Sequence, residues 1–369
     1  MSYYPAMRLL AILVTLISQP FGGITYIDRT ETSPRAVHMH IVQVDLSAPG
    51  LRFKLSPPSG GREVIRQTTL DYLTQEGGQV AVNAHYFLPF PSTDREAWLI
   101  GIAASEGRVY SAFEAPEQSF ALVRDAGGLN IDRENRATIV HRDREVADGV
   151  HVREAVTLWT TVSGSAQIVT DGVKTVPDYK DAQHPDALLD VGGPGTFSNE
   201  KSWYDVATAR TAIGLSRDGR TLTLFTVDVR GGSEGMRVGE VADVLMADYG
   251  VWNALNLDGG GSTSMAMEDP LTHRRALVNV SSDRDNPSAG RSVGSSLVVF
   301  APGWRPTWTA GLEWYAERAR PSDFMQFDFA LIGASAEMHE RLRAVPALEP
   351  LVDGGRWLLY RVRREPPTR

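Results

Sequence analysis

The chain has 369 residues, of which 42% are hydrophobic and 22% charged, as is typical of a folded globular protein with a sizeable core. Its formal net charge of −8 argues against a nucleic-acid-binding protein, which usually carries a basic face, so we expect no nucleic-acid partner. The absence of cysteine excludes disulfide bonds, a thiolate nucleophile and cysteine-ligated metal sites.

The N-terminus has the pattern of an export signal. Arg8 precedes an apolar run from Leu9 to Ile17, and Pro20 closes the run. This run is shorter than the roughly 20 residues that a membrane span needs, as is the apolar part of a signal peptide. We therefore expect residues 1–22 to be a signal segment and the protein to be exported to the periplasm, the cell envelope or the medium. The alternatives are an uncleaved membrane anchor, which would contact the membrane, and a buried first element of the fold.

Short strands and turns predominate in the first half of the remaining chain. Residues 37–46 read as a strand, and the apolar alternation slips at Ile41-Val42, which predicts a bulge. Thr68 or Thr69 is expected to cap a short helix that ends at Gly77-Gly78. An apolar strand over residues 80–82 then leads into Asn83.

The second half contains stronger signals. Asp218-Gly219 lies between two apolar runs and predicts a β-hairpin, whose second strand, 221–227, is apolar on both faces and is expected to be central. Apolar residues at helical spacing from Val238 to Tyr249 predict a helix, and Gly250 is the expected C-cap.

A break at Pro302 separates two regions. We expect residues 23–301 to form the main domain, with an α+β fold of mixed, largely antiparallel sheets flanked by helices. Residues 302–369 are expected to form a small β-α-β addition, with a helix starting near Ser335 and a disordered tail.

The polar end of one predicted strand organises the rest of the chain. Residues 252–257 alternate like a strand, and Asp258 is followed by Gly259, Gly260 and Gly261. Three glycines let the main chain approach a ligand closely, with amide groups around a small concavity. The simpler alternative is a tight turn between two strands.

Other polar groups lie at the boundaries of predicted strands. They are Asn83, Ser163, Gly164, Asp228, Arg210 and Arg291. If these strand ends converge, the site combines carboxylates, guanidinium groups, amides and hydroxyls. Arginine binds phosphate bidentately, and paired carboxylates perform glycoside chemistry. This inventory suits a substrate that has both sugar hydroxyls and a phosphate.

Several motifs resemble those of the phosphodiester glycosidase family. Residues 256–265, NLDGGGSTSM, resemble its NLDGGGSS/T-type signature, and residues 210–214 resemble its RTAIG. Residues 227–230 resemble VDGR with valine in place of glycine, and residues 82–87 resemble VNGGFF with both glycines replaced. The Ser163 turn and the strand that follows Arg291 also have counterparts, so the resemblance runs from about residue 35 to residue 300.

The resemblance implies a hydrolase that cleaves the bond between a sugar C1 and phosphate. We expect no cofactor and assign no metal ligands, and the sequence does not decide whether a cation takes part. Its catalytic candidates are Asp258, Asp228 and Asn83. Its substrate-binding candidates are Arg210, Arg291, Gly259, Gly260, Gly261, Ser262, Thr263, His85, Ser163 and Gly164. The expected partner is a sugar phosphate or a glycan phosphodiester. The alternatives are a non-catalytic envelope module that binds a glycan or polymer, favoured by the replaced motif residues, and a phosphodiesterase that cuts P–O.

Two histidines and three tryptophans are further candidates for binding roles. His38 and His40 share one face of a predicted strand, but a metal site needs a third ligand, and none is evident in the sequence. Trp304, Trp308 and Trp314 could form a sugar platform, although packing of the C-terminal addition is the better explanation.

Overall fold

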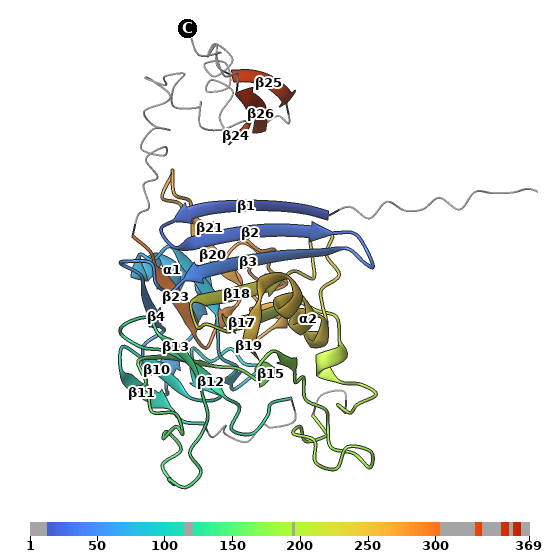
Figure 1. The fold of residues 1–369 in the computed structure, drawn as a ribbon. Helices are drawn as coiled ribbons and strands as arrows, with labels where there is room; N and C mark the ends of the chain where they lie inside the picture. Colours follow the sequence, from blue (N-terminus) through green and yellow to red (C-terminus); the bar gives the residue numbers. More distant parts are fainter. Residues whose placement is uncertain are drawn as a thin grey trace, which may run out of the picture. The chain divides into compact units, whose positions relative to one another are not determined.

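The structure is a computed structural model that describes residues 13–113, 121–193 and 196–302 and three strands nearer the C-terminus (Figure 1). The chain divides into two units, Met1–Gly303 and Trp304–Arg369. Among the described residues, no helix has both the length and the apolar character that crossing a membrane requires.

An eight-stranded sheet forms the centre of the first unit, and every neighbouring pair in it is antiparallel. In spatial order its strands are β1 (Leu13–Phe21), β2 (Ile24–Glu31), β3 (Val37–Asp45), β18 (Thr221–Val227), β17 (Arg210–Ser216), β19 (Val251–Asn256), β15 (Ala166–Thr170) and β16 (Val173–Lys174). Strands from distant parts of the sequence are therefore neighbours.

Two five-stranded antiparallel sheets accompany it. One contains β11 (Arg108–Ser111), β10 (Ala103–Ser105), β14 (Thr160–Ser163), β12 (Gly128–Ile131) and β13 (Ala137–Val140). The other contains β21 (Arg275–Leu277), β20 (Met265–Glu268), β7 (Val80–Asn83), β23 (Ser296–Phe300) and β4 (Arg52–Leu55). Short pairings join β22 (Ser292–Val293) to β6 (Gln67–Thr68), and β9 (Glu96–Leu99) to β5 (Val64–Ile65) and β8 (Phe87–Leu88). The prediction of several antiparallel sheets with few helices is confirmed.

The central strands of the eight-stranded sheet are buried on both faces. On one face, leucine and isoleucine side chains of β17, β18 and β19 pack against the five-stranded sheets; they include Ile213, Leu222, Leu224 and Leu255. On the other face, Ala212, Phe225 and Val227 pack with the apolar side of helix α2 (Val238–Tyr249). Each fully buried aliphatic side chain stabilises the fold by about 1.5–3 kcal/mol, so the sheet is a firm base for a functional site.

The predicted bulge in β3 is wrong, and the burial of this strand on both faces explains why. The strand pairs with β2 and β18 without a register shift. Ile41 belongs to the core under α2, and Val42 belongs to the core on the opposite face. Two adjacent apolar residues are therefore an ordinary feature of a strand covered on both sides, and they do not require an extra residue.

Two of the three predicted helices and the hairpin are confirmed. Helix α1 (Thr69–Glu76) is capped by Thr68, whose hydroxyl accepts the Asp71 amide, and it ends at Gly77. Helix α2 ends at Gly250, whose φ of 64° places it in the left-handed region. The residues around Asp218-Gly219 connect β17 to β18 as an antiparallel pair.

The two ends of the chain bear on other predictions. Leu13–Phe21, in the expected signal segment, forms β1 and pairs with β2. In the second unit, β26 (Trp357–Val362) pairs antiparallel with both β24 (Phe329–Gly333) and β25 (Leu348–Asp353). β25 was not predicted, and the helix expected near Ser335 and the three C-terminal tryptophans lie outside the described residues.

Replacing Thr68 by alanine should lower the free energy of unfolding by about 1 kcal/mol, because the first turn of α1 would lose its side-chain acceptor. Thr68→Ser retains the hydroxyl and is the matched control. Denaturant unfolding of the two variants measures the difference, and equal losses of stability would show that the cap contributes nothing.

Candidate functional site

The glycine-rich segment begins where β19 ends and contains the 3₁₀ helix η2 (Gly260–Ser262). Gly260 has a φ of 59°, a left-handed conformation that favours glycine. At Gly261, a Cβ atom would lie 2.1 Å from Nη2 of Arg291, so the guanidinium group rests directly on the bare main chain. The first glycine, Gly259, lies close to the main chain and side chain of Arg210. The run of glycines thus admits two arginines rather than simply forming a turn.

Asp258 is anchored through its main chain and enclosed around its side chain. Its amide donates to the carbonyl of Ala84 at 3.0 Å, and its carbonyl accepts from the Asn83 side chain at 2.6 Å. The residue is only 8% exposed. Burial raises the pKa of the Asp258 carboxyl to about 7, despite hydrogen bonding by Ser262 and the positive charge of Arg291. Asp258 can therefore exchange a proton near neutral pH.

Arg210 places a positive charge beside this segment. Its side chain is fully buried and donates to the carbonyls of Met236, Trp203 and Val206. Its Nη1 has no hydrogen-bond partner, and none of the described residues brings a carboxylate within ion-pair distance. Burial accordingly lowers the pKa of the guanidinium group. A buried charge without a counter-ion is costly, so this position favours an anion.

Arg291 reaches the segment from the opposite side and is partly exposed. Its Nε donates to Asp283 at 2.9 Å, and its guanidinium group lies 5.1 Å from the centre of the Phe90 ring. Phe90 is 48% exposed. An accessible guanidinium group beside an accessible aromatic ring can contact a ligand that has both a charged and an apolar part.

Asn83 fastens the segment to two sheets. Its amide nitrogen donates to the Asp258 carbonyl, while its oxygen accepts from the Thr211 hydroxyl and the Ser264 amide. Asn83 is fully buried, so these bonds are shielded from water. Its side chain therefore holds Asp258 in place, and its hydrogen-bonding groups are used for this purpose.

Asn256, which was not among the predicted site residues, places a further polar group next to Asp258 in the chain. Asn256 donates to Ser165 at 2.8 Å and to the Tyr86 hydroxyl at 3.3 Å. Burial and the nearby Asp258 carboxyl raise the pKa of Tyr86 to about 12, and Tyr204 also donates to Ser165. The alternation that placed Asn256 and Asp258 on one strand face was the available signal for Asn256.

Three further buried polar atoms in or beside this segment lack a partner among the described residues, and one of them is the hydroxyl of Ser264. The other two are Oδ1 of Asn256 and the hydroxyl of Thr263. Buried polar groups are nearly always hydrogen-bonded, so unpaired ones call for an explanation. Together with the free Nη1 of Arg210, they are the expected mark of a site that a polar ligand completes.

The amides of the glycine-rich segment are mostly used within the chain. Gly260 donates to the Ala209 carbonyl, and the amides of Ser262 and Thr263 donate back to Gly259 and Gly260. The Gly259 amide bonds to the Asp258 carboxyl. Most of the amides that were expected to face a ligand therefore donate to groups of the chain itself. The arginines are the more available donors.

His85, Ser163 and Gly164 lie in a supporting layer. His85 bonds to Ser295 at 2.8 Å and lies 3.0 Å from both the Ile102 carbonyl and the Ser163 amide. It is fully buried, and burial lowers its pKa to about 4. Gly164 packs so tightly that a Cβ atom would lie 2.0 Å from the Asn256 carbonyl oxygen. These residues shape the floor below Asn256, and His85 and Ser163 bond to each other rather than to Asp258 or an arginine.

Asp228 is not drawn into the cluster around Asp258. It continues the side of β18 that carries Leu222 and Leu224, whereas Arg210 continues the side of β17 that carries Ala212. Its carboxyl bonds to His40 and to the Val280 amide, and one oxygen lies 3.3 Å from His38. The two carboxylates that the sequence analysis paired therefore have different neighbours.

The chain is similar in sequence to proteins of one known family. Residues 76–300, more than half of the chain, match the model of the phosphodiester glycosidase family. This chain belongs to the phosphodiester glycosidase family. The N-acetylglucosamine-1-phosphodiester alpha-N-acetylglucosaminidase of Mus musculus is 28% identical over 245 residues, which cover 64% of this chain and 41% of the mouse protein. The Homo sapiens enzyme is 40% identical over 77 residues, covering 21% of this chain and 14% of that protein. The chain thus spans less than half the length of these relatives.

Solved structures show the same fold. The catalytic domain of the zebrafish N-acetylglucosamine-1-phosphodiester alpha-N-acetylglucosaminidase, auto-inhibited by its pro-peptide, matches with a TM-score of 0.52 and 22% identity. The match covers 81% of this chain and 86% of the zebrafish domain. A protein from Burkholderia pseudomallei matches with a TM-score of 0.53 at 14% identity, over 81% of this chain and 98% of that one. The glycine-rich segment of this phosphodiester glycosidase family member lies within the matched region.

The raised pKa of Asp258 predicts a pH-dependent effect of Asp258→Asn on stability. The folded state holds its proton up to about pH 7 and the unfolded state only up to about pH 4, so the wild type loses stability between these values as pH rises. Asparagine resembles the protonated form, so the variant should gain on the order of a few kcal/mol relative to the wild type between pH 4 and pH 8.

Asp283→Asn is the control of opposite sign. Burial alone would raise the pKa of Asp283, but hydrogen bonds from Asp285 and Arg291 lower it overall. The folded-state pKa lies below the unfolded-state pKa of about 4, so this variant loses stability relative to the wild type as pH rises through the range below about pH 4, and the difference between the two proteins stays constant from pH 4 to pH 8. Denaturant unfolding from pH 4 to pH 8 measures both, and a parallel response of the two variants would contradict the assignment.

Proposed function

We propose that this chain is an exported hydrolase that cleaves the bond between C1 of a sugar and the oxygen of a phosphodiester. The observation that carries the proposal is the buried guanidinium group of Arg210, which has no carboxylate within ion-pair distance in the described part of the chain and borders the segment that holds Asp258. Membership of the phosphodiester glycosidase family supports the reaction type.

The reaction follows from the charges in the cluster. A water molecule attacks C1, Asp258 accepts the water proton, and the C1–O bond breaks with its electron pair moving to the phosphate. A base whose pKa lies near 7 suits catalysis at neutral pH. The leaving group is a phosphate monoester with a second pKa of about 6, so it needs little help from an acid.

The arginines stabilise the charge that develops on the phosphate. Arg210 supplies its Nη1 beside Gly259, and Arg291 supplies an accessible guanidinium group beside Gly261. Phe90 lies beside Arg291 and offers an apolar surface to a sugar ring. Asn83 is a positioning residue, because its donors and acceptor already hold the Asp258 segment.

Export is proposed from the N-terminal pattern. Residues 1–22 act as the signal segment, residues 23–301 form the glycosidase domain, and residues 302–369 form a separate extension. The strand β1 would then be present only in the unprocessed chain.

Asp258→Asn should lower kcat for release of the sugar from a sugar-1-phosphodiester by at least about 100-fold, because the base is lost. Thr68→Ser changes a helix cap outside the cluster, so it is the control for the effects of making and purifying a variant. Retention of full activity in Asp258→Asn would refute the assignment, and binding without turnover by the wild type would indicate a non-catalytic module.

Hydrolysis in ¹⁸O-labelled water identifies the bond that breaks. Cleavage of C1–O leaves the phosphate monoester unlabelled, whereas cleavage of P–O places the label in the phosphate. Mass spectrometry of the phosphate product distinguishes these results, and labelled phosphate would rule out the glycosidase reaction.

Gly261→Ala should raise KM more than it lowers kcat, because a Cβ atom at this position would displace the Arg291 guanidinium group. We expect an increase of about 10-fold or more, which corresponds to the loss of about 1.4 kcal/mol of binding. Gly239→Ala is the matched control, since its Cβ atom would meet nothing within 4 Å. An unchanged KM in Gly261→Ala would show that Arg291 does not contact the substrate.

A further inference from the structure

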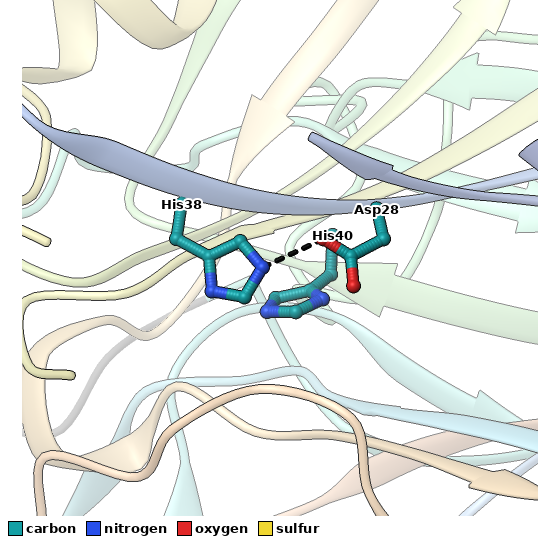
Figure 2. Close-up of side chains that lie close together, drawn as sticks. All are labelled: Asp28, His38 and His40. Carbon is teal, nitrogen blue, oxygen red and sulfur yellow. Dashed lines mark hydrogen bonds and ion pairs between the residues drawn. The ribbon is translucent and has the colours of Figure 1, made fainter. Parts of the chain in front are cut away.

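A second cluster of chemically active side chains lies on β2 and β3. His38 and His40 occupy alternate positions of β3 and therefore share one face, and Asp28 lies directly opposite His40 in the register with β2. Each of the three offers one ligand atom, and these atoms all lie within 4.8 Å of one another. Figure 2 shows the two imidazole rings and the carboxylate gathered on the same side of the strands.

We propose that Asp28, His38 and His40 bind a divalent transition-metal ion, with zinc as the favoured metal. Two imidazole nitrogens and one carboxylate oxygen are donors that suit zinc, whereas magnesium and calcium prefer shells made of oxygen. With metal–ligand bonds of about 2.0–2.2 Å, neighbouring ligand atoms in a tetrahedral site lie about 3.4 Å apart. The side chains need to move by only about 1 Å to reach that spacing.

Both histidines have partners that would orient them as ligands. The His40 ring contacts the Tyr26 hydroxyl through Nδ1 at 2.8 Å. The His38 ring faces Asp28 through Nε2 at 2.7 Å and faces Asp228 through Nδ1 at 3.3 Å. Metal-binding histidines commonly bond through the other ring nitrogen to an oxygen atom, which fixes the ring. Tyr26 and Asp228 supply this support here, so the cluster contains groups that orient the ligands as well as the ligands themselves.

The charge and exposure of the cluster favour a cation. Of the described residues, none brings a lysine or arginine within ion-pair distance of Asp28 or Asp228. The His38 side chain is 26% exposed and that of Asp28 is 34% exposed, while His40 and Asp228 are buried. An ion can therefore enter from the side of Asp28 and His38, and a fourth position remains for water.

The cluster is also joined to the segment that carries Asp258. The Asp228 carboxyl accepts the Val280 amide, and the next residues reach the glycine-rich segment: Asn279 bonds to Thr263, and the Ser282 hydroxyl donates to the Gly260 carbonyl. An ion that fixes His38 and Asp228 would thereby steady this connection. The metal site is independent of the proposed reaction, because it rests on other residues and on another face of the sheet.

Zinc binding by the full chain tests the proposal directly. Protein freed of metal with a chelator is titrated with zinc chloride in a calorimeter, and we expect one ion per chain and a rise in Tm. His38→Gln should weaken binding by at least about 100-fold, because changes to supporting partners alone cost about 10–100-fold. Asp28→Asn and His40→Gln should act similarly.

His184→Gln is the matched control, since His184 also contacts a carboxylate, that of Asp181 at 2.9 Å, but lies on the surface. It should bind zinc as the wild type does. Cobalt chloride provides a second readout, because the visible absorption of bound cobalt reports its ligands and should vanish in His38→Gln. If the buried His40→Gln fails to fold, the partly exposed His38→Gln decides the question. No zinc binding by the wild type, or wild-type affinity in His38→Gln, would overturn the proposal.

Discussion

The hydrogen bonds of the Asn83 side chain are the constraint on which the candidate site depends. One amide group ties β7 to β17 through Thr211, to the residue before β20 through Ser264, and to Asp258 itself. Because these bonds are buried, breaking one would leave a polar group without water or a partner. The main chain of Asp258 is therefore held at the junction of two sheets, even though it belongs to a segment rich in glycine.

Electrostatics explains why this junction is suited to binding an anion. The guanidinium group of Arg210 is buried with no carboxylate of the described ranges at ion-pair distance, and burial raises the pKa of the nearby Asp258 carboxyl to about 7. Each arrangement is unfavourable alone, and such costs are commonly found where a protein binds or transforms a ligand. The large core on both faces of the sheet supplies the stability that permits them.

Local features of the fold could be predicted from the sequence, whereas features set by pairing between distant strands could not. The hairpin at Asp218-Gly219 and the end of α2 at Gly250 follow from turn and cap chemistry and were predicted correctly. The proximity of Arg210 to the glycine-rich segment follows from a strand-end argument that also succeeded. The neighbours of Asp228, which are His40 and the Val280 amide, could not be foreseen, because the face on which a side chain emerges depends on where the alternation ends.

The third ligand of the proposed metal site shows this limit most clearly. His38 and His40 were recognised as sharing a face, but Asp28 becomes their neighbour only through the register of β2 against β3. Arg210 is a related case, since nothing in the sequence indicates that its donors are mostly spent on main-chain carbonyls. Cross-strand register and hydrogen-bond saturation are tertiary properties, and a single sequence carries little information on either.

The pairing of β1 with β2 has a consequence for how the protein would mature. If a peptidase removes residues 1–22, β2 becomes the outermost strand of the large sheet, with a row of main-chain groups open to pairing with another molecule. The newly uncovered border would carry Asp28, Arg29 and Glu31, and charged residues of this kind discourage such association. β2 lies between two strands before processing, and its charged residues already suit it to be an edge strand afterwards.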